Sequence, residues 1–190
     1  MTALDQAVAA IRSGDVGTLA GLLRDVPGLA GARIAKTPEG RTESRSLLHV
    51  ATDWPGHLPR VATTIALLVE AGADVDARFC GAHSETPLHW AASCDDVEAV
   101  DALVAAGADP ESDGAVIAGG TPMDDAVAFG QWRAAARLAE LGARTALWHA
   151  AGLGMLDRVA AHLAGTALLP AAHVIPGPHS GVRTPSWTGS

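Results

Sequence analysis

Residues 86–92 read Thr86-Pro-Leu-His89-Trp-Ala-Ala92, and the apolar stretch that follows them ends in Gly107-Ala-Asp109. A threonine hydroxyl can cap a helix N-terminus, and proline suits the first helical position because an N–H there would have no helical partner. Glycine ends a helix because it adopts the left-handed conformation at little cost. The stretch therefore predicts a unit of two helices with both of its ends marked.

Variants of this helix-start motif recur along the chain. They begin at Ser46 (SLLHVA), Thr121 (TPMDDA) and Thr145 (TALWHA), and in three units a second apolar helix ends at a glycine, namely Gly72, Gly107 or Gly142. A repeated motif of several residues is the mark of an array in which each unit buries its apolar face against the next. We expect one apolar side chain of each motif to pack inside, namely Leu48, Leu88, Met123 and Leu147. A small alanine of each motif should pack beside it, namely Ala51, Ala91, Ala126 and Ala150. Trp132 and Trp148 are also expected to be packed.

The motif and its Gly-Ala-Asp exit resemble the ankyrin repeat family, whose unit spans about 33 residues. The resemblance, which extends to bacterial ankyrin repeat domain-containing proteins, implies an all-α fold. That fold would be an ankyrin-repeat α-solenoid of about four to five helix pairs with finger loops between the repeats. The expected domain covers residues 1–164, with a degenerate N-terminal cap at 1–28, repeats at 46–78, 86–113, 121–144 and 145–164, and an irregular Pro/Gly-rich tail at 165–190.

The composition excludes several classes of protein. The chain has 190 residues, of which 48% are hydrophobic and 18% charged, so it is able to bury a core and is not a disordered protein. A net charge of −8 argues against nucleic-acid binding. Two cysteines and no signal-type N-terminus indicate the cytoplasm, and no apolar run is long enough to span a membrane.

Histidine occupies the fourth position of two motifs, at His49 and His89. The resemblance implies that each imidazole bonds to neighbouring backbone and joins one unit to the next. Asp124 and Trp148 stand at the matching positions of the other two units. We predict no metal and no cofactor, because Cys80-Gly-Ala-His83 has no second matching pair. The residues expected to have structural roles in the repeats are His49, Thr86, Pro87, His89, Thr121, Pro122, Gly72, Gly107 and Gly142.

The position after the histidine faces the concave groove in the ankyrin family. It holds Trp90, Asp125 and His149, and a second row lies one helical turn further along. The fingers add basic and aromatic side chains, and the third finger, residues 111–120, is expected to form a hairpin. The partner-binding residues predicted for the groove and fingers are Trp54, Trp90, Asp125, Phe129, His149, Arg41, Phe79 and His83.

Three functions are open at this point. The first is a non-enzymatic module that binds an unknown protein partner through its groove and fingers, with a monomer favoured. The second is a small-molecule-binding or catalytic site on the row Trp90/Asp125/His149, where an Asp–His pair would move protons. The third is a scaffold whose unpaired end assembles with another copy. Against catalysis, Asp124 and Asp125 open a helix, where acids are favoured by the helix dipole.

Charge is distributed unevenly along the chain. Residues 46–164 carry 16 acidic and 6 basic side chains, whereas residues 1–45 carry 5 and 6. The basic residues of the first finger are therefore expected either to steer an acidic segment of a partner or to pair with the acids of the protein itself. The two cysteines, Cys80 and Cys94, are expected to be free thiols.

Overall fold

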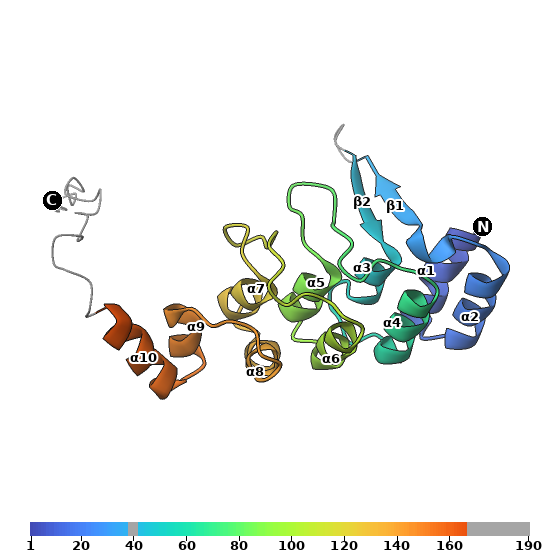
Figure 1. Cartoon of the computed structure of the whole chain (residues 1–190). Coiled ribbons are helices and arrows are strands. Elements are labelled where there is room, and N and C mark those ends of the chain that lie inside the picture. Colours follow the sequence, from blue (N-terminus) through green and yellow to red (C-terminus); the bar gives the residue numbers. More distant parts are fainter. Residues whose placement is uncertain (38–41, 167–190) are drawn as a thin grey trace, which may run out of the picture.

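The computed structural model describes residues 1–37 and 42–166, and it is rich in helix. Arg41 and residues 167–190 lie outside the described residues, and with them most of the segment expected to be a tail. Successive helices form pairs that run as a row along the molecule (Figure 1). The pairs are α1 (Ala3–Ser13) and α2 (Val16–Asp25), α3 (Leu47–Ala51) and α4 (Val61–Glu70), α5 (Pro87–Ser93) and α6 (Val97–Ala105), α7 (Pro122–Ala128) and α8 (Trp132–Glu140), and α9 (Leu147–Gly152) and α10 (Leu156–Thr166).

The helices pack in two layers, and each pair contacts its neighbours in the row. The first helices contact one another in the order α1, α3, α5, α7, α9, and the second helices α2, α4, α6 and α8 do the same. Leu48, Leu88 and Met123 are fully buried between the layers, as are the alanines of their motifs. A core built at the joints between pairs leaves the helix ends and the loops free to carry binding residues.

Helix ends follow the local chemistry of the motif. Helices α5 and α7 begin with a proline, directly after a threonine in extended conformation. The second helices of three pairs are followed, directly after the C-cap residue, by Gly72, Gly107 and Gly142, whose φ angles are 94°, 96° and 96°. A side chain at these positions would be strained, because L residues rarely adopt positive φ.

The structure corrects the expectation of an all-α fold. Strands β1 (Arg33–Lys36) and β2 (Glu43–Ser46) pair antiparallel, with Arg33 opposite Ser46 and Lys36 opposite Glu43. The first finger is long enough to return on itself, so its backbone groups pair with each other. The third finger, residues 111–120, was expected to form a hairpin. The backbone N–H of Gly114 donates to the carbonyl oxygen of Gly119 at 3.0 Å, but residues 111–120 form no strand.

The C-terminal end differs from expectation in two respects. Helix α10 continues to Thr166, two residues beyond the end expected for the last repeat. Leu147, Trp148 and Trp132, expected in the core, are instead exposed. Trp132 begins α8 in the fourth pair, and Trp148 lies near the start of α9 in the last described pair.

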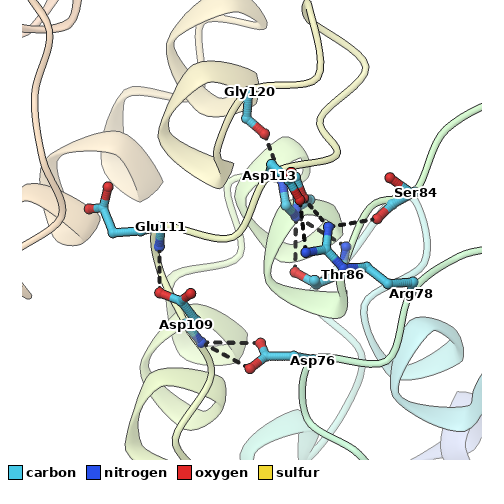
Figure 2. Close-up of polar contacts among 9 residues, drawn as sticks. Asp76, Arg78, Ser84, Thr86, Asp109, Glu111, Asp113 and Gly120 are labelled. Carbon is cyan, nitrogen blue, oxygen red and sulfur yellow. Dashed lines mark hydrogen bonds and ion pairs between the residues drawn. The ribbon is translucent and has the colours of Figure 1, made fainter.

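Hydrogen bonds from backbone N–H groups to side-chain carboxylates also join the exits of successive pairs. The Asp76 carboxylate accepts the backbone N–H of Asp109 at 3.1 Å, and Glu111 accepts that of Arg144 at 2.7 Å. Figure 2 shows the first of these exit bonds below the cluster in which Arg78 reaches Ser84 and Asp113. Each exit bond spans 33 residues. The repeat is thus held together on its exit side as well as in its core.

Candidate binding groove

Two buried histidines connect consecutive helix pairs. The backbone N–H of Thr86 donates to Nδ1 of His89 at 3.1 Å, so Nε2 carries the proton and donates to the carbonyl oxygen of Gly120 at 3.2 Å. In the same way, Nε2 of His49 lies 3.1 Å from the carbonyl oxygen of Glu85. Burial lowers the pKa of both imidazoles to about 4. Each therefore stays neutral near pH 7 and fixes the end of the next finger, just before the following helix begins.

The last helix pair has a different register from the one that we expected. Helix α9 has Ala146 as its N-cap, and His149 occupies the position that His49 and His89 hold in their helices. The motif therefore begins one residue later than Thr145. His149 is buried, and its Nε2 lies 2.9 Å from Oδ1 of Asp124. It joins two pairs and does not face the groove, which corrects its assignment as a partner-binding residue.

Asp125 is also misplaced in the sequence prediction. Its side chain is 0% exposed, and Oδ1 accepts the backbone N–H of Ile117 from the third finger at 3.3 Å. Burial, opposed by this hydrogen bond, raises its pKa to about 6. Because the third finger lies over Asp125, this residue is not available to a partner. The expected row Trp90/Asp125/His149 is not assembled, since His149 pairs with Asp124 instead.

The remaining aromatic residues of the groove do come together. An open groove of about 290 Å³ runs beside α5, between the end of α3 and the end of α7. Trp54 is 82% exposed at one side and Phe129 is 46% exposed at the other, with Trp90 between them. We call this the aromatic groove, and its lining residues are Thr52, Asp53, Trp54, Glu85, Trp90, Ser93, Cys94 and Phe129.

Trp90 also forms part of a second hollow, below the β1–β2 hairpin, together with Phe79. The ring centroids of Trp90 and Phe79 are 5.6 Å apart, and the His49 ring lies 4.8 Å from Trp90 in an edge-on arrangement. The guanidinium of Arg45 lies 5.9 Å from the centre of the Trp90 ring. These contacts hold Trp90 in place between the two hollows. His83 of the second finger is exposed outside the aromatic groove.

Two basic residues of the first finger, Arg33 and Arg45, pair within the protein. Arg45 donates to Oδ2 of Asp53 at 2.7 Å. Arg33 donates to the carbonyl oxygens of Ser44 and Arg78 at 2.8 and 2.7 Å. These contacts favour the hypothesis that the basic residues of the first finger pair within the protein over the hypothesis that they steer an acidic segment of a partner.

Glu85 is the residue of the aromatic groove that the sequence prediction missed. It lies just before Thr86, and its side chain is 7% exposed. Burial raises the pKa of its carboxyl group, while a hydrogen bond from the Trp90 side chain acts in the opposite direction. The motif gives no reason to single out this position. The only signal is an acidic residue at the end of a finger, next to a buried helix start.

Metal and membrane features can be assessed for the described part of the chain. Residues 1–37 and 42–166 contain no cluster of three or more side chains able to hold a metal ion, and no helix among them is long and apolar enough to cross a membrane. Cys80 is exposed, Cys94 is half-buried, and both are free thiols. Burial raises the pKa of the Cys94 thiol to about 11, so it is a poor nucleophile at neutral pH.

One known protein family matches a part of this chain. Residues 83–114, which hold α5, α6 and the flanking loops, match the family model described as Ankyrin repeat. The match identifies an ankyrin repeat at these residues, as the motif at Thr86 predicted. Proteins of this family are generally protein–protein interaction modules and generally not enzymes. A search among curated proteins returned no match.

Proposed function

We propose that the protein is a non-enzymatic interaction module that binds a segment of a partner protein in the aromatic groove. In this proposal the helix pairs form an ankyrin-repeat solenoid, with repeats in 46–78, 86–113, 121–144 and 145–164 behind an N-terminal cap at 1–28. The observation that carries the proposal is Trp54, which is 82% exposed in one groove with Trp90 and Phe129. Phe79 extends this surface toward the fingers.

Aromatic side chains gathered in this way are typical of binding surfaces. An exposed tryptophan keeps a large apolar area in contact with water, and burying that area against a partner is favourable by about 25 cal/mol per Å². Tryptophan is also enriched among the few residues that contribute most of the binding energy at interfaces. The contacts of Trp90 with His49, Phe79 and Arg45 hold one wall of the groove in place before binding. A wall that is already ordered loses little entropy on binding.

The catalytic alternative receives no such support. It required a carboxylate of the groove beside His149, and the carboxylate found there belongs to Asp124, at a buried joint between helix pairs. Asp125 lies under the third finger. We therefore do not assign acid–base chemistry to this row.

The proposal is tested by selecting binders from a random peptide library on the intact chain and measuring their affinity by fluorescence anisotropy. Trp54→Ala should weaken the selected peptides by at least about tenfold, which corresponds to about 1.4 kcal/mol. The matched control is Trp132→Ala, because Trp132 is 50% exposed on α8 and does not line the aromatic groove. Peptides that bind both variants as tightly as the native protein would remove the groove from this account.

We further propose that the protein is a monomer in the cytoplasm. The two free thiols fit a reducing compartment, where exposed cysteines do not form disulfides. Sedimentation equilibrium gives the mass in solution and tests the monomer directly. A dimer whose formation depends on the exposed Leu147 and Trp148 would support the scaffold hypothesis instead.

A further inference from the structure

We propose that the partner segment is basic, and that one of its lysine or arginine side chains enters the aromatic groove, between the rings of Trp54, Trp90 and Phe129 and against the carboxylate of Glu85. This inference rests on the proposed function and specifies the chemistry of the partner. It does not depend on any metal or cofactor.

The first argument is the position of Glu85. Its side chain is 7% exposed and lines the aromatic groove. Within the described chain, no lysine, arginine or histidine forms an ion pair with it. Burial raises the pKa of this carboxyl group, while a hydrogen bond from the Trp90 side chain and the charge of His83 act in the opposite direction. A cation that entered the groove would provide the missing opposite charge.

The second argument is that other polar atoms near Glu85 also have no partner. Asp125 feels the charge of Glu85, and its Oδ2 atom is buried without a hydrogen bond. Ser93 lines the groove, and its buried Oγ atom likewise has no partner. Asp125, although covered by the third finger, therefore adds a second acidic group near Glu85, whereas the Ser93 hydroxyl is itself buried. This environment favours a ligand that carries positive charge and donates hydrogen bonds.

The third argument comes from an arrangement inside the protein. The Arg45 guanidinium, which lines the hairpin hollow, lies 5.9 Å from the Trp90 ring centre and pairs at 2.7 Å with Asp53, an acid that lines the aromatic groove. A cation close to an aromatic ring is attracted by the negative face of its π system, most strongly for tryptophan. The groove side of Trp90 offers the same combination, an aromatic ring with a carboxylate, but open to solvent. Arg45 lines the hairpin hollow and does not line the aromatic groove.

Overall charge points in the same direction. Residues 46–164, which contain all the lining residues of the groove, carry 16 acidic and 6 basic side chains. Opposite potentials steer association and disfavour partners of like charge. The expectation that the first finger attracts an acidic segment is weakened, because Arg33 and Arg45 are bonded within the protein.

The test compares three sets of twelve-residue peptides that differ only at one central position, which is lysine or arginine, glutamate, or methionine. Each set is titrated into the full chain and followed by fluorescence anisotropy. Peptides with a central cation should bind at least about tenfold more tightly than the matched methionine and glutamate peptides. Glu85→Gln should reduce this preference to about threefold or less, because the amide keeps the shape of the side chain without its charge.

The control is Glu98→Gln, because Glu98 is exposed in the first turn of α6 and its removal changes the net charge by the same amount. It should leave the preference unchanged. A second variant, Phe129→Leu, keeps an apolar side chain but removes an aromatic face. It should weaken the cationic peptides about threefold and leave the methionine peptides unaffected. Circular dichroism spectra establish that each variant is folded, and Phe129→Leu tests the proposal even where Glu85→Gln does not fold.

The outcomes separate this inference from the proposed function. Equal binding of cationic and methionine peptides, weakened in both cases by Trp54→Ala, would overturn the cationic ligand while the groove stayed the binding site. An equal loss in Glu85→Gln and Glu98→Gln would show nonspecific attraction to an acidic protein and would also overturn it. Binding of every set that is insensitive to Trp54→Ala would contradict both proposals.

Discussion

The imidazole of His149 lies 2.9 Å from the carboxylate of Asp124, whereas the corresponding imidazoles of His49 and His89 meet backbone carbonyl oxygens. Asp124 itself stands at the motif position of histidine in α7, and it also accepts the backbone N–H of Thr121 at 2.6 Å. The Asp124 carboxylate thus caps the start of α7 and also binds His149 of the next helix pair. At the joint between the last two pairs, the histidine therefore meets a side chain where the other two joints offer backbone.

We expect Asp124→Ala to loosen the last helix pair selectively. The change removes the acceptor of Thr121 and leaves His149 buried without its partner, at a cost of about 1–3 kcal/mol for each unsatisfied group. Hydrogen exchange should quicken in α9 and α10 and stay unchanged in α1–α4. The control is Asp113→Ala, because Asp113 is an exposed residue paired with Arg78. Uniform exchange along the whole chain would contradict a local role of Asp124.

We expect His89→Ala to destabilise the protein by about 3 kcal/mol, because it leaves a cavity and removes the partners of Thr86 and Gly120. Burial lowers the pKa of His89 from 6.5 to about 4. Its contribution to stability is therefore complete above pH 6.5 and is lost as the pH falls through about 4. Urea unfolding at several pH values should show the native protein and the variant converging in acid. His83→Ala, at an exposed position, is the control and should cost little.

We expect Asp125→Asn to stabilise the protein at neutral pH. The pKa of Asp125 is raised from 3.8 to about 6 by burial, with smaller contributions from the charges of Glu85 and Asp124. The stability that this group contributes is present below pH 3.8 and is lost as the pH rises through about 6. Since one pKa unit corresponds to about 1.4 kcal/mol, the variant should gain about 2–3 kcal/mol relative to the native protein across this range.

Denaturant unfolding of native and Asp125→Asn protein between pH 3.5 and 7.5 measures this gain. The control has the opposite sign, because hydrogen bonds from Thr2 lower the pKa of Asp5. Asp5→Asn should therefore lose stability relative to the native protein as the pH rises. A constant difference between Asp125→Asn and the native protein at all pH values would show that the carboxyl group is not buried by the third finger.

We expect Gly114→Ala to disrupt the third finger, whereas Gly119→Ala should be tolerated much better. Both residues have positive φ, 112° and 69°. A Cβ at Gly114 would lie 2.5 Å from the carbonyl oxygen of Ser84, while a Cβ at Gly119 would meet nothing within 4 Å. The first variant combines a clash with backbone strain of about 1–3 kcal/mol, and the second has the strain alone. Thermal melting midpoints distinguish them, and equal midpoints would contradict the close approach of the two fingers.

The local chemistry of the motif was sufficient to place most helices, because proline and glycine set their ends independently of the rest of the chain. The last unit was shifted by one residue because Ala146-Leu-Trp-His149 has neither threonine nor proline at its start, so that only the histidine reveals the register. The exposure of Trp132 depends on what lies beyond its helix pair, which periodicity does not report.

The site was harder to predict than the fold. Trp54, Trp90 and Phe129 were placed on one face by counting positions within the repeat, and the structure places them around one groove. Asp125 has the same position in its repeat as Trp90, but a finger of different length folds over it. Glu85 belongs to a finger, where no periodic pattern applies. Finger length and path therefore determine which groove residues are available.

The exit bonds from Asp76 to Asp109 and from Glu111 to Arg144 both span 33 residues, although the helix-start motifs that they accompany are spaced unequally. The edge of the molecule that carries the exit bonds consequently has a constant spacing, whereas the finger loops along the other edge vary in length. Extra residues inserted in the fingers change the shape of the recognition surface without altering the spacing of the exit bonds. A whole module inserted into the row, by contrast, must keep the 35 residues that separate Asp76 from Glu111 and Asp109 from Arg144.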